Sequence, residues 1–290
     1  MTPRGGSAIL RRMCVPTLRR SPIAAAAAAV ALAACTTTPY TNRSQIMLIS
    51  PEQETRLGAT AFQQVKKESS IVAKPQVSGP VADIGRRIAA VADRPDYRWE
   101  FVVIDDPKTP NAFALPGGKV AVYTGLFPIA KTTSGLAVVM GHEVAHALAR
   151  HGAERASQGM LAKTGGVILG AAVATQSPGN AQAAMALYGL GTQVGVLLPW
   201  SRTQESEADH IGLLLMAKAG YDPREALDFW QRMSQAGGKK TAEFLSTHPG
   251  HDTRQSDIQR WLPEAIAIYE RSAKAPVEPL PGIDVASRGR

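Results

Sequence analysis

The sequence is poor in cysteine and in aromatic residues, and each shortage narrows the class of fold. Its two cysteines, Cys14 and Cys35, both lie near the start, so the body of the chain has no disulfide framework. Aromatic residues make up 6% of the chain, while alanine and glycine are abundant. That balance favours closely packed helices over a β-sandwich, and 290 residues suffice for one large domain or two small ones.

The chain also lacks a basic surface once its first segment is set aside. The formal net charge is +8, but residues 1–34 carry five arginines and no acid, and without them it falls to +3. No block of lysine and arginine with interleaved aromatics occurs in the remainder. Nucleic-acid binding is therefore not supported.

Residues 1–35 have the features of an export signal. An arginine-rich part ends at Arg19-Arg20, and the apolar run that follows, residues 23–34, is too short to span a bilayer comfortably. The run ends in Leu32-Ala33-Ala34-Cys35, which resembles the lipobox of bacterial lipoproteins. This resemblance implies that Cys35 is lipidated and becomes the mature N-terminus.

Two features of this region bear on location. Thr36, rather than an aspartate, follows the cysteine, which implies a lipid-anchored protein on the periplasmic face of the outer membrane. An uncleaved N-terminal anchor is the alternative to a cleaved signal, and Met13 is an alternative start to Met1.

These signals divide the chain into four predicted parts. Residues 1–34 form a lipoprotein signal peptide, and residues 35–50 form a polar, lipid-anchored tether. Residues 51–272 form the globular domain. Residues 273–290 form a flexible tail, because prolines and glycines interrupt them and no apolar period runs through them.

The apolar pattern predicts a mainly helical α+β fold with a small sheet. Strands are expected at 99–104 and 119–124, with Pro116-Gly117-Gly118 as a turn before the second. Apolar residues three or four apart predict helices at 51–69, 81–91, 133–152, 200–219, 224–235 and from 252 onward.

A glycine- and alanine-rich stretch, residues 161–200, is harder to place. Residues 180–200 carry no charge, so a transmembrane span is one alternative, but Gln182, Gln193 and Pro199 weaken it. The favoured interpretation is buried or loosely packed helices near the active site.

The strongest motif is Gly141-His142-Glu143-Val144-Ala145-His146. On a helix, His142 and His146 lie one turn apart on one face, so their ring nitrogens can hold a Zn²⁺ ion. Glu143 stands beside them, where it can take a proton from a water that the metal activates. This is the H-E-x-x-H pattern of zinc metalloproteases, and it disfavours the alternative of buried structural histidines.

A catalytic zinc site needs a third protein ligand, and it should come from another helix. Glu205 is the predicted ligand. Asp209 lies one turn further along on the same face, where it can accept a hydrogen bond from the second nitrogen of a ligand histidine. Glu207 points elsewhere and is expected to face solvent.

Three motifs in order resemble peptidase family M48, which includes the CaaX prenyl proteases, HtpX, BepA and LoiP. They are His142-Glu143-Val144-Ala145-His146, Glu205-Ser206-Glu207-Ala208-Asp209 and Ser246-Thr247-His248-Pro249. The resemblance covers about residues 51–260, and the short LoiP-like periplasmic lipoproteins fit best.

The resemblance implies a zincin-like metallopeptidase domain over residues 51–272, with the sheet packed on the H-E-x-x-H helix. It implies one Zn²⁺ per chain on His142, His146 and Glu205, and catalytic Glu143. It also implies that His248 either stabilises the oxyanion or caps the metal at rest.

A further part of the resemblance concerns the substrate. Asn111 and the turn Pro116-Gly117-Gly118 are similar to the family's segment leading into a substrate-side edge strand, where an extended peptide can pair with the sheet. A merely structural hairpin is the alternative. Of the other histidines, His151 is expected to close the helix, and His210 and His251 to lie at the surface or in loops.

The predicted function is that of a membrane-anchored zinc endopeptidase that cleaves misfolded or unassembled envelope proteins. The alternative is a latent protease that acts mainly as a chaperone or assembly factor for outer-membrane proteins, with the assembly machinery as its partner. A non-catalytic structural lipoprotein is disfavoured, because the ligands and the base are all present.

Overall fold

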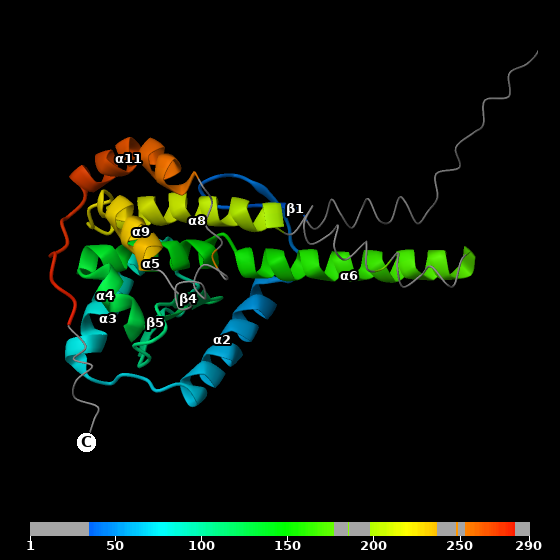
Figure 1. Ribbon diagram of the computed structural model, residues 1–290, viewed down its shortest axis with the longest axis horizontal. Coiled ribbons are helices and arrows are strands. Elements are labelled where there is room, and N and C mark those ends of the chain that lie inside the picture. The colour runs from blue at the N-terminus through cyan, green and yellow to red at the C-terminus, as the bar shows by residue number, and fades with distance from the viewer. Residues whose placement is uncertain (1–34, 177–184, 186–197, 237–247, 249–252, 282–290) are drawn as a thin grey trace, which may run out of the picture. The chain divides into compact units, whose positions relative to one another are not determined.

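The computed structural model describes residues 35–176, 185, 198–236, 248 and 253–281. Its order of elements confirms the predicted α+β, mainly helical fold (Figure 1). The elements are β1 (Cys35–Thr37), β2 (Ser44–Ile46), α2 (Pro51–Glu68), α3 (Pro75–Val91), β3 (Glu100–Ile104), β4 (Ala112–Leu115), β5 (Lys119–Tyr123), η1 (Thr124–Leu126), α4 (Phe127–Ala130), α5 (Thr133–Leu148), α6 (His151–Gln176), α8 (Leu198–Lys218), α9 (Glu225–Gln235) and α11 (Arg254–Arg271).

Local chemistry sets where the helices begin. Ser50 and Gln53 form a capping box at the start of α2, each side chain accepting from the backbone N–H of the other, and Pro51 occupies the first turn. The Thr132 hydroxyl accepts from the Gly135 N–H, 3.1 Å away, at the start of α5. Every residue of α5 is buried, as its apolar composition predicts.

The sheet has three strands in the order β3-β5-β4. β3 runs parallel to β5 with Glu100 opposite Lys119, and β4 runs antiparallel to it with Ala112 opposite Val122. The two predicted strands and the turn at residues 116–118 are confirmed. β4 is an additional strand, which lies between β3 and β5 in sequence but at one edge of the sheet. Both β3 and β4 are edge strands of this sheet.

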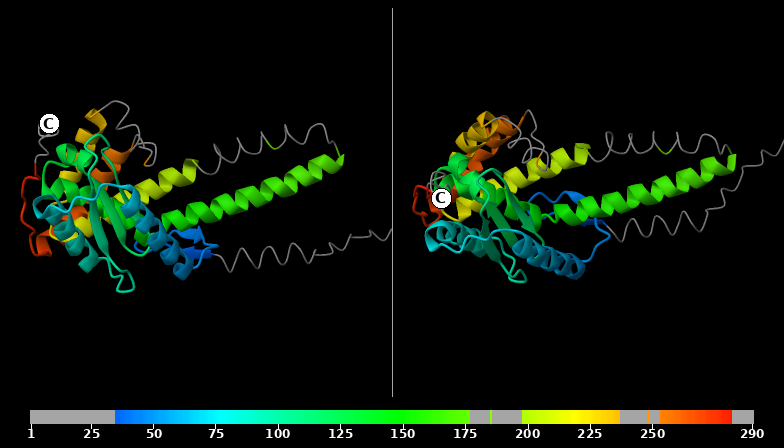
Figure 2. Two further views of the ribbon diagram at one scale, coloured as in Figure 1. Left: turned by 90° about the horizontal axis from the view of Figure 1, so that it is seen from below. Right: turned by 60° about the horizontal axis from the view of Figure 1, so that its bottom comes forward.

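Helix α5 lies at the centre of the fold (Figures 1 and 2). It contacts β4, α3, α8 and α9, and α11 covers α8. α5 and α8 touch backbone to backbone, because a Cβ on Gly141 would lie 2.8 Å from the Gly212 carbonyl oxygen. A Cβ on Gly212 would lie 2.7 Å from the backbone nitrogen of His142. Two glycines therefore set how closely the two helices approach.

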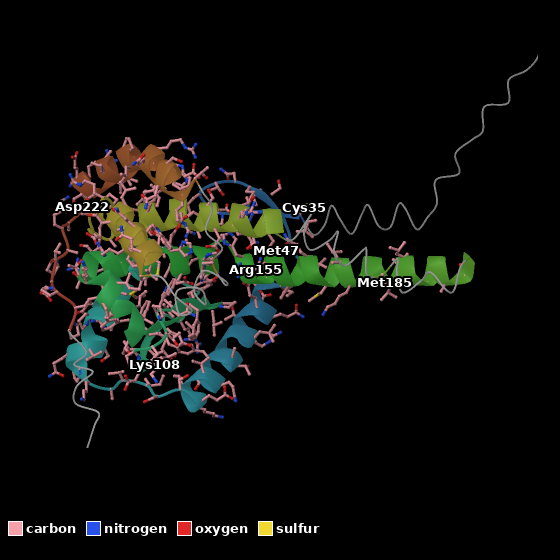
Figure 3. All side chains as sticks on the ribbon, viewed as in Figure 1. Cys35, Met47, Lys108, Arg155, Met185 and Asp222 are labelled. Atoms are coloured by element: carbon pink, nitrogen blue, oxygen red, sulfur yellow. The ribbon has the colours of Figure 1, made fainter. Side chains whose placement is uncertain are left out.

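The predicted tether at residues 35–50 is packed rather than extended. Thr38, Gln45 and Met47 are each less than a tenth exposed. The Leu48 N–H donates to the Ser157 hydroxyl on α6 at 2.9 Å, and Figure 3 shows Met47 beside the first turns of that helix. Residues of this segment have partners that lie far away in sequence, such as Glu207 for the Thr38 hydroxyl and Ser157 for the Leu48 N–H.

The described part of the predicted tail is packed as well. The Leu280 N–H donates to the Lys131 carbonyl at 2.8 Å, and the Ala275 N–H donates to the Gly220 carbonyl at 2.9 Å. Backbone pairing thus fixes residues 273–281 despite their prolines. Residues 282–290, like the predicted signal at 1–34, lie outside the described residues.

The prediction for residues 161–200 is buried or loosely packed helices, and the described part up to Gln176 is helical but largely exposed. Val167 is 71% exposed and Ile168 is 65% exposed, and Figures 1 and 2 draw the far part of α6 away from the sheet. Residues 177–184 and 186–197 lie outside the described residues. Among the helices that are described, none has the length and apolarity needed to cross a bilayer.

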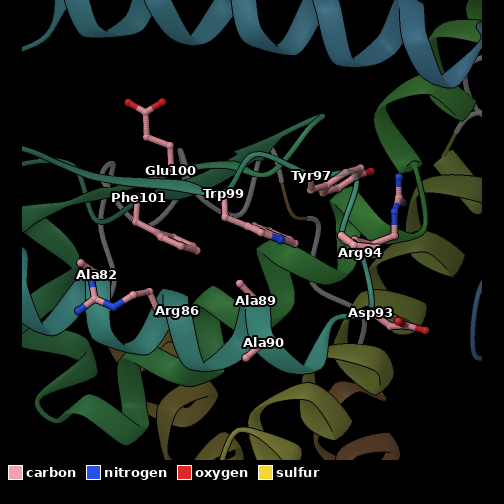
Figure 4. Close-up of a pocket in the computed structure, with 11 residues that line it drawn as sticks. Ala82, Arg86, Ala89, Ala90, Asp93, Arg94, Tyr97, Trp99, Glu100 and Phe101 are labelled. Atoms are coloured by element: carbon pink, nitrogen blue, oxygen red, sulfur yellow. The ribbon is translucent and has the colours of Figure 1, made fainter.

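A groove lies between α3 and the approach to β3 (Figure 4). The rings of Trp99 and Phe101 stack there with centroids 6.1 Å apart and planes within 4°. Phe101 lies against Gly85 of α3, where a Cβ would come within 2.4 Å of its ring. These aromatics attach the sheet to α3, and no predicted metal ligand lines the groove.

Candidate metal centre

Four side chains from three parts of the chain converge at one buried point: His142, His146, Glu205 and His248. The Nε2 atoms of His142 and His146 are 3.1 Å apart, and each lies 3.3 Å from an oxygen of Glu205. His248 Nδ1 lies 3.3 Å from His142 Nε2 and 3.2 Å from Glu205 Oε2. Two turns of α5 and one of α8 supply the first three, as the sequence predicts.

This donor set fits Zn²⁺. Zinc–nitrogen bonds of about 2.0–2.1 Å place neighbouring ligands of a tetrahedral site roughly 3.3 Å apart, close to the separations found here. Glu205 Oε1 is buried and makes no hydrogen bond, so it retains lone pairs for a cation. Imidazole nitrogens with one carboxylate are the ligands of catalytic zinc sites.

The electrostatics of Glu205 and His146 also suit a cation. Burial alone would raise the pKa of Glu205, but His146, His142 and His248 outweigh it and hold that pKa well below its usual range. Burial likewise lowers the pKa of His146 well below its usual value, which favours a neutral ring with a lone pair to donate. The centre thus pairs an ionised carboxylate with a neutral imidazole.

Asp209 lies where the sequence predicts, behind the first ligand. Its Oδ1 is 2.9 Å from His142 Nδ1, and its Oδ2 accepts from Arg254 Nε at 2.7 Å. Burial by itself would lower the pKa of His142, but Asp209 and Glu205 raise it to about 10. Arg254, at the start of α11, also reaches Glu205 Oε2 at 3.3 Å and lies over the Trp230 ring at 4.0 Å.

Arg254 was missed by the sequence analysis. No spacing rule links it to α8, because 45 residues separate it from Asp209 and only the packing of α11 on α8 brings them together.

The predictions for His151 and Glu207 are wrong. His151 begins α6, is fully buried, and places its Nδ1 2.8 Å from the Nδ1 of His146. Its Nε2 lies 3.1 Å from Glu207 Oε2, and Glu207 is 6% exposed rather than facing solvent. Helical spacing puts Glu207 on a different side of α8 from Glu205, but His151 and the residues Thr38–Arg43 cover that side.

The first residues of the described chain surround Glu207. The hydroxyls of Thr38 and Thr41 donate to its Oε1, the former at 2.6 Å. Arg43 Nε donates to its Oε2 at 2.7 Å, and the two terminal nitrogens of Arg43 donate to Glu154, each at 2.7 Å. Burial would raise the pKa of Glu207, but the bonds from His151, Thr38, Thr41 and Arg43 lower it to about 2.

Glu143 lies beside the cluster and next to the sheet edge. Its Oε1 is buried without a hydrogen bond and lies 3.4 Å from His248 Nε2. Burial raises its pKa, which His248, His142 and, to a smaller extent, the backbone N–H of Ala114 in β4 partly offset. Edge strand β4, which lies between Asn111 and the turn of residues 116–118, therefore passes beside the predicted base, whereas β5, the strand after the turn, is the central strand of the sheet.

The remaining histidines play no part in the cluster within the described residues. His210 stacks on Trp261 of α11 with centroids 4.6 Å apart, and its Nε2 lies 3.3 Å from Glu264. It is a partly exposed group, as predicted. His251 lies outside the described residues.

The comparisons with known proteins agree with this geometry. Residues 75–262 match the family described as Peptidase family M48. The chain is 39% identical over 239 residues to the mitochondrial metalloendopeptidase OMA1 of Schizosaccharomyces pombe, with 81% of this chain and 68% of the relative covered. The corresponding protein of Saccharomyces cerevisiae is 33% identical over 253 residues, with 81% and 71% covered.

Bacterial proteins are among the relatives too. The beta-barrel assembly-enhancing protease of Yersinia pestis is 29% identical over 216 residues, with 73% of this chain and 44% of that protein covered. The relatives therefore include mitochondrial as well as bacterial proteins.

Proposed function

Since the chain belongs to peptidase family M48, a family of zinc-dependent metallopeptidases, we propose that it is an endopeptidase that holds Zn²⁺ on His142, His146 and Glu205. The observation that carries this proposal is the convergence of the two α5 histidines and the α8 carboxylate within 3.3 Å of one another. Their burial keeps bulk water from competing for the cation.

The chain's own residues suit peptide hydrolysis. A bound Zn²⁺ would act as a Lewis acid toward the peptide carbonyl and lower the pKa of a water molecule. Glu143, with its pKa raised by burial, is placed to take that proton and return it to the leaving amine. Edge strand β4 offers backbone groups with which an extended substrate can pair, directly beside Glu143.

The test is cleavage of casein by the purified chain. We expect turnover that a chelator abolishes and added Zn²⁺ restores, together with one zinc per chain by metal analysis. Turnover that survives complete removal of the metal would contradict the proposal.

For location and substrate, we propose a lipid anchor at Cys35, exposed at the start of β1, and misfolded or unassembled envelope proteins as substrates. The support is the lipobox-like sequence and the bacterial relative whose name refers to beta-barrel assembly. The OMA1 relatives, by contrast, are named as mitochondrial proteins. In a bacterial host, wild type should incorporate a labelled fatty acid and Cys35→Ala should not. Equal labelling of the two would contradict the anchor.

His248 favours a second candidate function, that of a latent protease acting mainly as an assembly factor. Its Nδ1 stands where a fourth ligand would stand, in contact with His142 and Glu205, and this contact would close the open position that catalysis needs. If His248 caps the metal, His248→Ala should cleave casein faster than wild type. A variant no faster than wild type would argue against latency and favour the oxyanion role.

A further inference from the structure

We propose that His151 and Glu207 form a positioning pair for the ligand His146, and that the segment Thr38–Arg43 completes this pair, so that the N-terminal part of the folded chain belongs to the metal centre. The proposal rests on the zinc site proposed above. It assigns a role to two residues that local sequence spacing places at a helix end and in solvent.

The hydrogen-bond directions follow from the distances. If the Nε2 of His146 donates its lone pair to the metal, the ring's proton must lie on Nδ1. That N–H can then donate to the Nδ1 of His151, 2.8 Å away. His151 must in turn carry its proton on Nε2, which donates to Glu207 Oε2 at 3.1 Å.

Glu207 makes this order of donors the favoured one. An ionised carboxylate only accepts hydrogen bonds, so it selects the His151 tautomer with its proton on Nε2. That tautomer leaves the His151 Nδ1 as an acceptor for His146 and keeps the His146 Nε2 free of a proton. The reverse order would put a proton on His146 Nε2 and prevent it from binding a metal.

The segment Thr38–Arg43 holds the Glu207 carboxylate in place. Thr38 donates to Oε1 at 2.6 Å and Arg43 to Oε2 at 2.7 Å. Arg43 bridges Glu207 to Glu154, which is itself fully buried and accepts from Gln204 Nε2 at 2.7 Å. The Glu207 carboxylate thus makes charge-assisted contacts on both of its oxygens, which is the arrangement that fixes its orientation.

The first test measures zinc affinity rather than turnover, by competition with a fluorescent chelator on the full chain. His151→Phe keeps a ring but cannot accept from His146, and Glu207→Gln keeps the shape but loses the charge. Outer partners of metal-ligating histidines typically contribute about 10–100-fold in affinity, so we expect each variant to bind Zn²⁺ more weakly by that factor. The visible spectrum of the Co²⁺-loaded protein should also shift, because the His146 ring is no longer held.

The chain provides a matched control. His210 and Glu264 form another histidine–glutamate contact, at 3.3 Å, that involves α8 and reaches none of the metal ligands. His210→Phe and Glu264→Gln should leave the zinc affinity and the Co²⁺ spectrum of the wild type unchanged.

The second test concerns the N-terminal segment. Arg43→Met removes the donor that bridges Glu207 and Glu154, and we expect several-fold weaker zinc binding, with partial recovery in Arg43→Lys. Adding Arg43→Met to His151→Phe should cost little more, because both act through the one ring of His146. Arg86→Met, which removes an exposed arginine paired with Asp83, is the control.

The outcomes separate this proposal from the proposed function. Wild-type zinc affinity and Co²⁺ spectra in His151→Phe and Glu207→Gln would overturn the positioning pair, whether or not the protein cleaves casein. If His151→Phe does not fold, Glu207→Gln and Arg43→Met decide in the same assay. A wild-type chain that binds zinc but cleaves nothing would overturn only the proposed function, and one that binds no zinc would overturn both.

Discussion

His142 and His146 lie one turn apart on α5, yet the residues that contact their second ring nitrogens lead to different parts of the chain. Behind His142 stand Asp209 and Arg254, the latter at the start of α11. Behind His146 stands His151, followed by Glu207 and the segment Thr38–Arg43. A carboxylate can therefore orient a ligand histidine directly, as Asp209 does for His142, or through a second imidazole, as Glu207 does for His146.

The backbone between α5 and α6 accounts for the difference. Arg150 has φ 58°, a left-handed conformation that non-glycine residues seldom adopt. This residue follows the C-cap of α5 and directly precedes His151, the first residue of α6, whose Nδ1 lies 2.8 Å from that of His146. On the His142 side no such turn intervenes, and Asp209 reaches the ring directly from α8.

The largest effect should come from removing the predicted general base, Glu143. In Glu143→Gln the metal ligands are intact but the proton acceptor is lost, so we expect casein cleavage to fall by about 10²–10⁴-fold. Zinc affinity should stay at the wild-type value, as measured by chelator competition. Retained turnover in this variant would refute the assignment of Glu143 as the base.

A second prediction disturbs both sides together. Gly212→Ala places a methyl group against the α5 backbone, 2.7 Å from the backbone nitrogen of His142. We expect this contact to push α8, which carries Glu205, Glu207 and Asp209, away from α5. Overpacking of this kind costs about 1–3 kcal/mol of stability, measurable by urea unfolding, and zinc binding should weaken with it. Gly159→Ala, in open space on α6, should do neither.

A third prediction breaks the His142 side alone. Asp209→Asn removes the charge that faces both His142 and Arg254, and we expect zinc affinity to fall by about 10–100-fold. Because the two sides act on different ligands, its effect should add to that of His151→Phe in free energy. If the free-energy effects of Asp209→Asn and His151→Phe are strongly non-additive, the contacts behind His142 and those behind His146 form one network. That result would contradict the independence of the two sides.

The smallest effect should come from a single donor at the far end of the His146 side. Thr41→Val removes one hydroxyl from Glu207 but leaves Thr38 and Arg43 in place. One hydrogen bond of this kind contributes about 0.5–1.5 kcal/mol, so stability should fall by that amount in thermal unfolding, with zinc affinity changed by no more than a few-fold. Loss of zinc as large as in Glu207→Gln would show that Thr41 alone positions the carboxylate.

Much of the centre was predictable because its signals are local. His142 and His146 are four apart on a buried helix, and Glu205 and Asp209 are four apart on another, so helical geometry alone puts each pair on one face. The capping box at Ser50 and the turn at residues 116–118 are equally local. What failed were predictions from polarity: Glu207 and the segment 38–43 are polar, but they bury one another.

Spacings of a few residues were enough to predict the ligand set, its order along the chain and the helices that carry it, but β4, the strand beside the predicted base, was not predicted. The groups behind each predicted ligand follow from the packing of distant segments: Arg254 lies behind Asp209, and His151, Glu207 and Arg43 lie behind His146. A buried charge must be paired, and its partners can lie anywhere in the sequence. Pairs separated by more than 40 residues, or joined across a left-handed turn, leave no periodic mark in the chain.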